Sequence, residues 1–147
     1  MTYPDPAVSH AITTRFVPLR LDYQSPAARP LHILWLPTVL VLDARGVEHA
    51  RSINALPPAD FLDVLDLGEA RMRLRGAEHA VAAQRLEDAL ARRDHGPLHD
   101  EALYFLGIAR YFRDRNDGAI RDATWAELTR RYPDSIWAHR IPSFLER

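Results

Sequence analysis

The sequence predicts a mixed α/β fold in its first half and an all-helical second half. Residues 38–43 form an apolar, β-branched run, and a glycine-containing turn separates this run from a return strand over residues 47–53. Beyond Gly76 the apolar residues recur at helical spacing between short breaks of glycine, proline, asparagine and aspartate. We therefore expect a domain over residues 1–75, followed by an α-helical hairpin unit over residues 76–147.

The segment before the first apolar run is predicted to hold a helix and a strand. Asp5 followed by Pro6 combines a good N-cap with a proline at the first helical position, so a short helix should end near Thr14. Residues 16–22 alternate between apolar and other side chains, which is typical of a strand. Pro18 has no backbone N–H, and this favours an edge position for that strand.

Further helices are predicted from the spacing of apolar residues after the return strand. The first starts within residues 57–60, and its apolar positions pack one face. The others cover residues 77–93, 99–115 and 118–131, and a last short helix begins near Ser135. Gly107 lies inside one of these helices at a cost of about 1 kcal/mol relative to alanine. We expect Gly107 to permit a close approach of the backbone to a neighbouring element.

Composition narrows the classes of function. The chain has 147 residues, of which 47% are hydrophobic and 27% charged, and this is typical of a soluble globular protein. A net charge of −1 gives no electrostatic case for nucleic acid or a membrane surface as partner. No segment approaches the ~18 continuous apolar residues of a membrane span. The first six residues lack the basic and apolar regions of a signal peptide, so we expect a cytoplasmic location.

The chain contains no cysteine, which excludes disulfides, thiolate metal ligands and cysteine nucleophiles. All 19 basic residues are arginine, which indicates a GC-rich bacterial genome. The sequence contains no serine–histidine–aspartate constellation, no phosphate-binding glycine loop and no nucleotide fingerprint. We therefore assign no catalytic residue and no cofactor.

The most informative motif is Trp35-Leu36-Pro37-Thr38. It opens the apolar strand, which stops at the turn over residues 42–46, and a proline-initiated helix follows over residues 57–62. In this order the segments resemble the C-terminal part of the thioredoxin superfamily, and the resemblance covers residues 3–67. It implies an α/β thioredoxin-like fold with a cis peptide bond before Pro37.

The resemblance also implies that the family's N-terminal central strand and its redox dithiol would precede Met1. Residues 16–22 and 38–43 would then border an empty slot in the sheet. Either the natural chain begins further upstream, or the sequence is an excised piece, or another segment or protomer fills the slot. For the chain alone, we expect the two strands to close on each other or a homodimer to form through the sheet edge.

Residues 77–140 resemble a tetratricopeptide-like helical unit. The resemblance is carried by Leu106-Gly107, by Trp125 and Leu128, and by the ending over residues 132–138. Such units often leave an aromatic groove for a partner peptide. The candidate groove residues are Tyr104, Tyr111, Trp125 and Trp137. The alternative is that these rings are simply core.

Two residues of the proline motif have two interpretations each. Pro37 is either a cis-proline that the turn requires, which we favour, or part of a surface that binds extended peptide. Trp35 is expected to be core, because tryptophan is highly buried on average, and a peptide-stacking surface is the alternative.

One cluster has metal-ligand chemistry, and it is formed by His95, His99, Asp100 and Glu101. The break at residues 96–97 should separate the two histidines, and acids at a helix N-terminus are explained by the helix dipole. We therefore assign no metal site.

Arg71, Arg73 and Arg75 alternate near the end of a predicted helix. On a helix these positions spread around the cylinder, so we expect a solvated helix end rather than an anion-binding patch.

Two classes of function remain. The first is a non-catalytic thioredoxin-like binding or assembly protein, in which the helical unit docks an unidentified protein or peptide. The alternative is the C-terminal fragment of a thiol–disulfide oxidoreductase whose Cys-x-x-Cys lies upstream of Met1. Disulfide exchange requires a thiolate, so the first class follows for these 147 residues.

Overall fold

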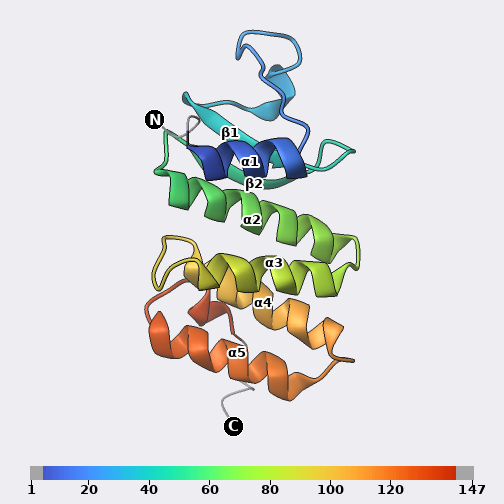
Figure 1. Ribbon diagram of the computed structural model, residues 1–147, viewed down its shortest axis with the longest axis vertical. Helices are drawn as coiled ribbons and strands as arrows, with labels where there is room; N and C mark the ends of the chain where they lie inside the picture. Colours follow the sequence, from blue (N-terminus) through green and yellow to red (C-terminus); the bar gives the residue numbers. More distant parts are fainter. Residues whose placement is uncertain (1–4, 142–147) are drawn as a thin grey trace.

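The computed structural model describes residues 5–141 of the chain (Figure 1). Its elements follow in the order α1 (Pro6–Arg15), η1 (Arg29–Leu31), β1 (Thr38–Leu42), β2 (Glu48–Ile53), α2 (Pro58–Arg75), α3 (His79–Ala91), α4 (His99–Arg113), α5 (Gly118–Arg131) and η2 (Ala138–Arg140). These residues form a mixed α/β protein with a two-stranded antiparallel sheet and five α-helices. Tyr3 and Pro4, which carry part of the thioredoxin resemblance, lie outside the described residues.

The elements stack along the long axis of the molecule (Figure 1). α2 lies between the sheet and α3, and α4 and α5 follow as further layers. The segment that joins α1 to β1 extends beyond the sheet, at the end opposite to α5. α2 is therefore the element shared by the sheet-bearing half and the helical half.

The helices predicted from local signals are confirmed. The Asp5 carboxylate accepts hydrogen bonds from the backbone N–H groups of Ala7 at 2.9 Å and Val8 at 3.1 Å, which makes it the N-cap of α1. α3, α4 and α5 begin and end within two residues of the predicted bounds. The short helix predicted near Ser135 is only the 3₁₀ turn η2.

The hairpin and its proline are also confirmed. β1 pairs with β2, and the backbone N–H of Asp43 donates to the carbonyl of Val47 at 3.0 Å across the turn. Gly46 has φ = +79°, in the left-handed region that favours glycine. The peptide bond between Leu36 and Pro37 is cis.

The strand predicted over residues 16–22 is wrong. The segment has no regular secondary structure, and Val17 and Leu19 are 95% and 78% exposed. The backbone groups of residues 17–21 make no hydrogen bond to other described residues. Alternation alone does not make a strand, because the backbone also needs a neighbour to pair with. The expected direct closure of residues 16–22 on 38–43 is therefore wrong as well.

Two of the hydrophobic clusters meet at α2. The first joins α1, β1 and α2 through Val8, Ala11, Val41, Phe61 and Leu65. The second joins α2, α3 and α4 through Leu67, Ala70, Ala82, Ala83, Leu86, Ala102, Leu106 and Ala109. Gly68 lies where α2 crosses the hairpin, and a Cβ atom there would be 2.8 Å from the Cβ of Val41. Only glycine allows so close a crossing.

A ladder of buried acids runs along α2, and we call it the acidic ladder. Asp63, Asp66 and Glu69 are at most 5% exposed. Their partners are Arg15 at the end of α1, Arg85 in α3, and Arg92 and Arg93 just after α3. Arg15 lies 2.7 Å from Asp66 and 2.6 Å from Glu69. Buried charges require such partners, so the acidic ladder holds α1, α2 and α3 in one arrangement.

Candidate functional site

A large hollow opens beside the cis-proline, and we call it the proline hollow. Its volume is about 1400 Å³. It is lined by Ile12 of α1, by Pro18, Leu19, Arg20, Leu21, Asp22 and Tyr23 of the irregular segment, and by Leu36, Pro37 and Thr38 at the start of β1. At this hollow, the irregular segment that was wrongly predicted to be a strand lies next to the beginning of β1.

The edge of β1 that faces away from β2 has open backbone groups. The backbone N–H of Asn54 donates to the carbonyl of Pro37 at 2.8 Å, and in an antiparallel pair the bonded residues then alternate along the strand. The backbone groups of Val39 and Val41 thus point to β2, and those of Leu40 point to the opposite edge. Residues 5–141 place no strand along that edge.

The surroundings of the proline hollow are apolar and exposed. Leu19 is 78% exposed, Trp35 66%, Leu36 53% and Tyr23 52%. The expectation that Trp35 is core is wrong, because no element among the described residues covers it. Large apolar side chains rarely form a contiguous exposed patch on a protein surface, and where they do, the patch marks an interaction site.

The candidate groove residues of the helical half pack mainly on one another. The ring of Tyr104 stacks on Trp125 at 5.4 Å and contacts Trp137 at 5.1 Å between centroids. The indole N–H of Trp125 donates to the Tyr104 carbonyl at 3.0 Å. Tyr111 is linked to this group by Arg121, whose guanidinium lies 5.1 Å from the centroids of both the Tyr111 and the Trp125 rings. None of the four candidate residues lines the proline hollow.

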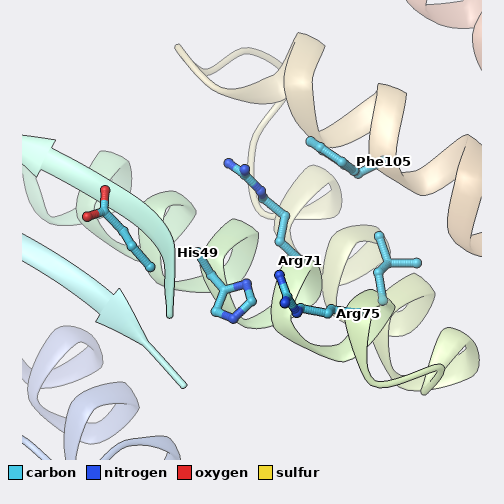
Figure 2. A pocket seen from close by; sticks show the side chains of 6 residues that line it. His49, Arg71, Arg75 and Phe105 are labelled. Carbon is cyan, nitrogen blue, oxygen red and sulfur yellow. The ribbon is translucent and has the colours of Figure 1, made fainter. Parts of the chain in front are cut away.

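The three alternating arginines of α2 divide into two groups. Arg73 pairs with Glu78 at 2.7 Å and with Glu69 at 3.7 Å. Arg71 and Arg75, one turn apart, instead line a second hollow of about 260 Å³, which we call the junction hollow (Figure 2). Its other lining residues are Glu48 and His49 of β2, Leu74 of α2 and Phe105 of α4. The expectation of a solvated helix end for all three arginines is therefore wrong for Arg71 and Arg75, and their spacing of four residues was the signal that they share one side of the helix.

The cluster with metal-ligand chemistry is dispersed in the structure. His99 is buried, with its Nε2 3.9 Å from Asp63, and burial lowers its pKa. Asp100 accepts a hydrogen bond from the Ser135 hydroxyl at 2.5 Å. Glu101 lies 3.3 Å from Arg71, and burial raises its pKa while the arginine opposes this. Within residues 5–141, histidines and carboxylates do not gather in threes in a geometry that could hold a metal ion.

The structure thus defines a mixed α/β protein with an open sheet edge beside a hollow. Comparison of the chain with family models, with curated proteins and with solved structures finds no significant match in any of the three. None of the helices within residues 5–141 is both long and apolar enough to cross a membrane.

Proposed function

We propose that this chain is a non-catalytic, thioredoxin-like binding or assembly protein that docks an extended segment of another polypeptide in the proline hollow. The observation that carries the proposal is the hollow itself, which lies between β1 and the irregular segment over residues 18–23. The thioredoxin-like assignment is supported by the cis-proline and by the order of helix, extended segment, hairpin and helix.

An inserted extended segment would satisfy two needs at once. It would pair with the open edge of β1, where each new hydrogen bond contributes about 0.5–1.5 kcal/mol. It would also cover Leu19 and Leu36, and each 100 Å² of apolar surface removed from water contributes about 2.5 kcal/mol. Addition of a strand to a sheet edge is a common mode of peptide recognition, and it favours side chains that are apolar at alternate positions.

The helical half is proposed as a tetratricopeptide-like scaffold that braces the sheet. Its helices follow α2 as successive layers, with α3 on α2, α4 on α3 and α5 on α4. The ring of Tyr104 in α4 stacks on the ring of Trp125 in α5. We therefore place the docking site at the proline hollow rather than on the aromatic side chains of the helical half.

The docking site is tested by selecting peptides from a displayed decapeptide library on the immobilised chain. Selected peptides should alternate apolar and polar residues, and Leu19→Asp should weaken their binding about tenfold or more, since burying a leucine contributes 1.5–3 kcal/mol. The control is Ile136→Asp, which changes a side chain that is 60% exposed and lies outside the hollow. Equal binding to the two variants would refute the site.

A second copy of the chain is the first partner to examine, through pairing of the two β1 edges. Light scattering should detect a dimer that Leu40→Pro abolishes, because this change removes an N–H group that points to the open edge. Val41→Pro should instead destabilise the fold, because it removes a bond to β2. A monomer at high concentration excludes the second copy and leaves the peptide selection as the decisive test.

The second candidate function is the oxidoreductase fragment described above. The observation that favours it is that Leu36, Pro37 and Thr38 line an open hollow instead of being covered by protein. In-frame DNA upstream of Met1 that encodes a strand and a Cys-x-x-Cys would support this alternative, and its absence would remove it.

A further inference from the structure

The junction hollow lies where the sheet-bearing half meets the helical half, and it gathers basic side chains from two elements. Arg71 and Arg75 come from successive turns of α2, and His49 comes from β2 (Figure 2). The His49 ring is buried, and its Nε2 lies 3.1 Å from the carboxylate of Asp43, which fixes its orientation. Phe105 of α4 closes the other side.

The two guanidinium groups in the hollow are not fully neutralised. Arg71 has one ion-pair partner, Glu101, at 3.3 Å, and its guanidinium lies 5.3 Å from the centroid of the Phe105 ring. Arg75 makes no ion pair or hydrogen bond with residues 5–141. Like charges one helical turn apart repel each other and destabilise a helix. Arg73, which points elsewhere on the same helix, is satisfied by two carboxylates.

Glu48, the acidic residue that lines the hollow, already has a partner in Arg51. Both carboxylate oxygens of Glu48 are bound by Arg51, at 2.8 Å from Nε and 2.6 Å from Nη2. This bidentate pair with Arg51 is the largest cause that lowers the pKa of Glu48, and the nearby charge of Arg71 lowers it further. Glu48 makes its hydrogen bonds to Arg51, and it acts on Arg71 through charge alone. The hollow thus offers guanidinium donors above an apolar floor of Leu74 and Phe105.

From this arrangement we propose that the junction hollow binds the oxyanion group of a small organic acid, a phosphate or a carboxylate, between Arg71 and Arg75. Guanidinium groups match the planar, bidentate geometry of such groups. The volume of about 260 Å³ suits a small acid rather than a large cofactor. Leu74 and Phe105 would contact its apolar part. This site is independent of the proline hollow.

The test is a nuclear magnetic resonance titration of the full chain at constant ionic strength, with inorganic phosphate and with benzoate as probes. Signals of His49, Arg71, Arg75 and Phe105 should shift in a saturable manner. Saturation by phosphate alone, by benzoate alone or by both supports the site and identifies the preferred oxyanion. Absence of saturation with both probes overturns it.

Three variants separate a specific site from general attraction of anions. Arg75→Gln should weaken binding about tenfold, whereas Arg45→Gln should leave it within about twofold, because Arg45 lies on the hairpin turn and does not line the hollow. Glu101→Gln should tighten binding severalfold, because it removes the carboxylate that competes for Arg71. A gain of affinity cannot come from misfolding. Equal losses in Arg75→Gln and Arg45→Gln, or no gain in Glu101→Gln, would contradict the proposal.

Discussion

Replacing Gly107 of α4 with alanine tests a close contact between α4 and α5. A Cβ atom at this position would lie 2.6 Å from the Cδ1 atom of Trp125, and closer still to Nε1. The indole would have to move, and its hydrogen bond to the Tyr104 carbonyl at 3.0 Å would be lost. The sequence-based expectation that Gly107 permits a close approach is thus confirmed.

The magnitude follows from three contributions to the free energy of unfolding. Overpacking costs about 1–3 kcal/mol, the lost hydrogen bond costs about 1 kcal/mol, and the better helix propensity of alanine returns about 1 kcal/mol. We expect Gly107→Ala to lower the stability by about 1–3 kcal/mol in urea denaturation followed by far-UV circular dichroism. The midpoint of thermal unfolding should fall by roughly 2–4 °C for each kcal/mol.

The matched control is Gly118→Ala at the start of α5. A Cβ atom there would meet only the end of the Arg121 side chain, at 3.6 Å. We expect its stability to stay within about 0.5 kcal/mol of the original chain. If Gly107→Ala proves as stable as the control, or more stable, the close contact with Trp125 does not exist.

Three further predictions concern charge and chemistry. Asp66→Asn should lower the stability by about 2–3 kcal/mol, because it removes a buried carboxylate charge that pairs with both Arg15 and Arg92. Glu48→Gln, in an exposed pair, should cost at most about 1 kcal/mol, and urea denaturation measures both changes. Burial lowers the pKa of His99 in the folded chain, so the unfolded chain binds the proton more readily and stability should fall as the pH drops below about 6.5. His99→Gln should flatten this dependence, and an unchanged slope would show that His99 does not cause it. The purified 147-residue chain should not reduce insulin disulfides above background, since it has no thiol, and measurable turnover would contradict the non-catalytic assignment.

Helices and turns could be predicted from the sequence because their signals are local. The N-cap at Asp5, the helical spacing beyond Gly76 and the glycine of the hairpin turn each depend on a few neighbouring residues. The cis bond at Pro37 was predicted from the resemblance to the thioredoxin superfamily rather than from a local signal, and the structure confirms that the bond is cis.

The segment over residues 16–22 could not be predicted from its own pattern. Alternation tells which side chains would share a face of a strand, but pairing depends on a second segment that is distant in sequence. The same limitation explains Trp35, whose exposure depends on whether another element covers it.

The acidic ladder was missed for a different reason. Acids in a helix are normally assigned to a solvated face, and Asp63, Asp66 and Glu69 were not singled out as buried. α2, however, is covered on one side by the sheet and α1 and on the other by α3 and α4. The sequence did hold a signal for these ion pairs. The three acids of the ladder recur at a spacing of three residues, and the two adjacent arginines Arg92 and Arg93 end the next predicted helix.

The acidic ladder also bears on the order in which the chain can fold during synthesis. α2 leaves the ribosome before Arg85, Arg92 and Arg93, so Asp63 cannot yet be neutralised by its later partners. Arg92 and Arg93, and His99 beside them, all belong to the helical half, so the pairing of Asp63 is completed only when that half packs on α2. The acidic ladder is therefore complete only after α3 has been made, and the two halves should finish folding together.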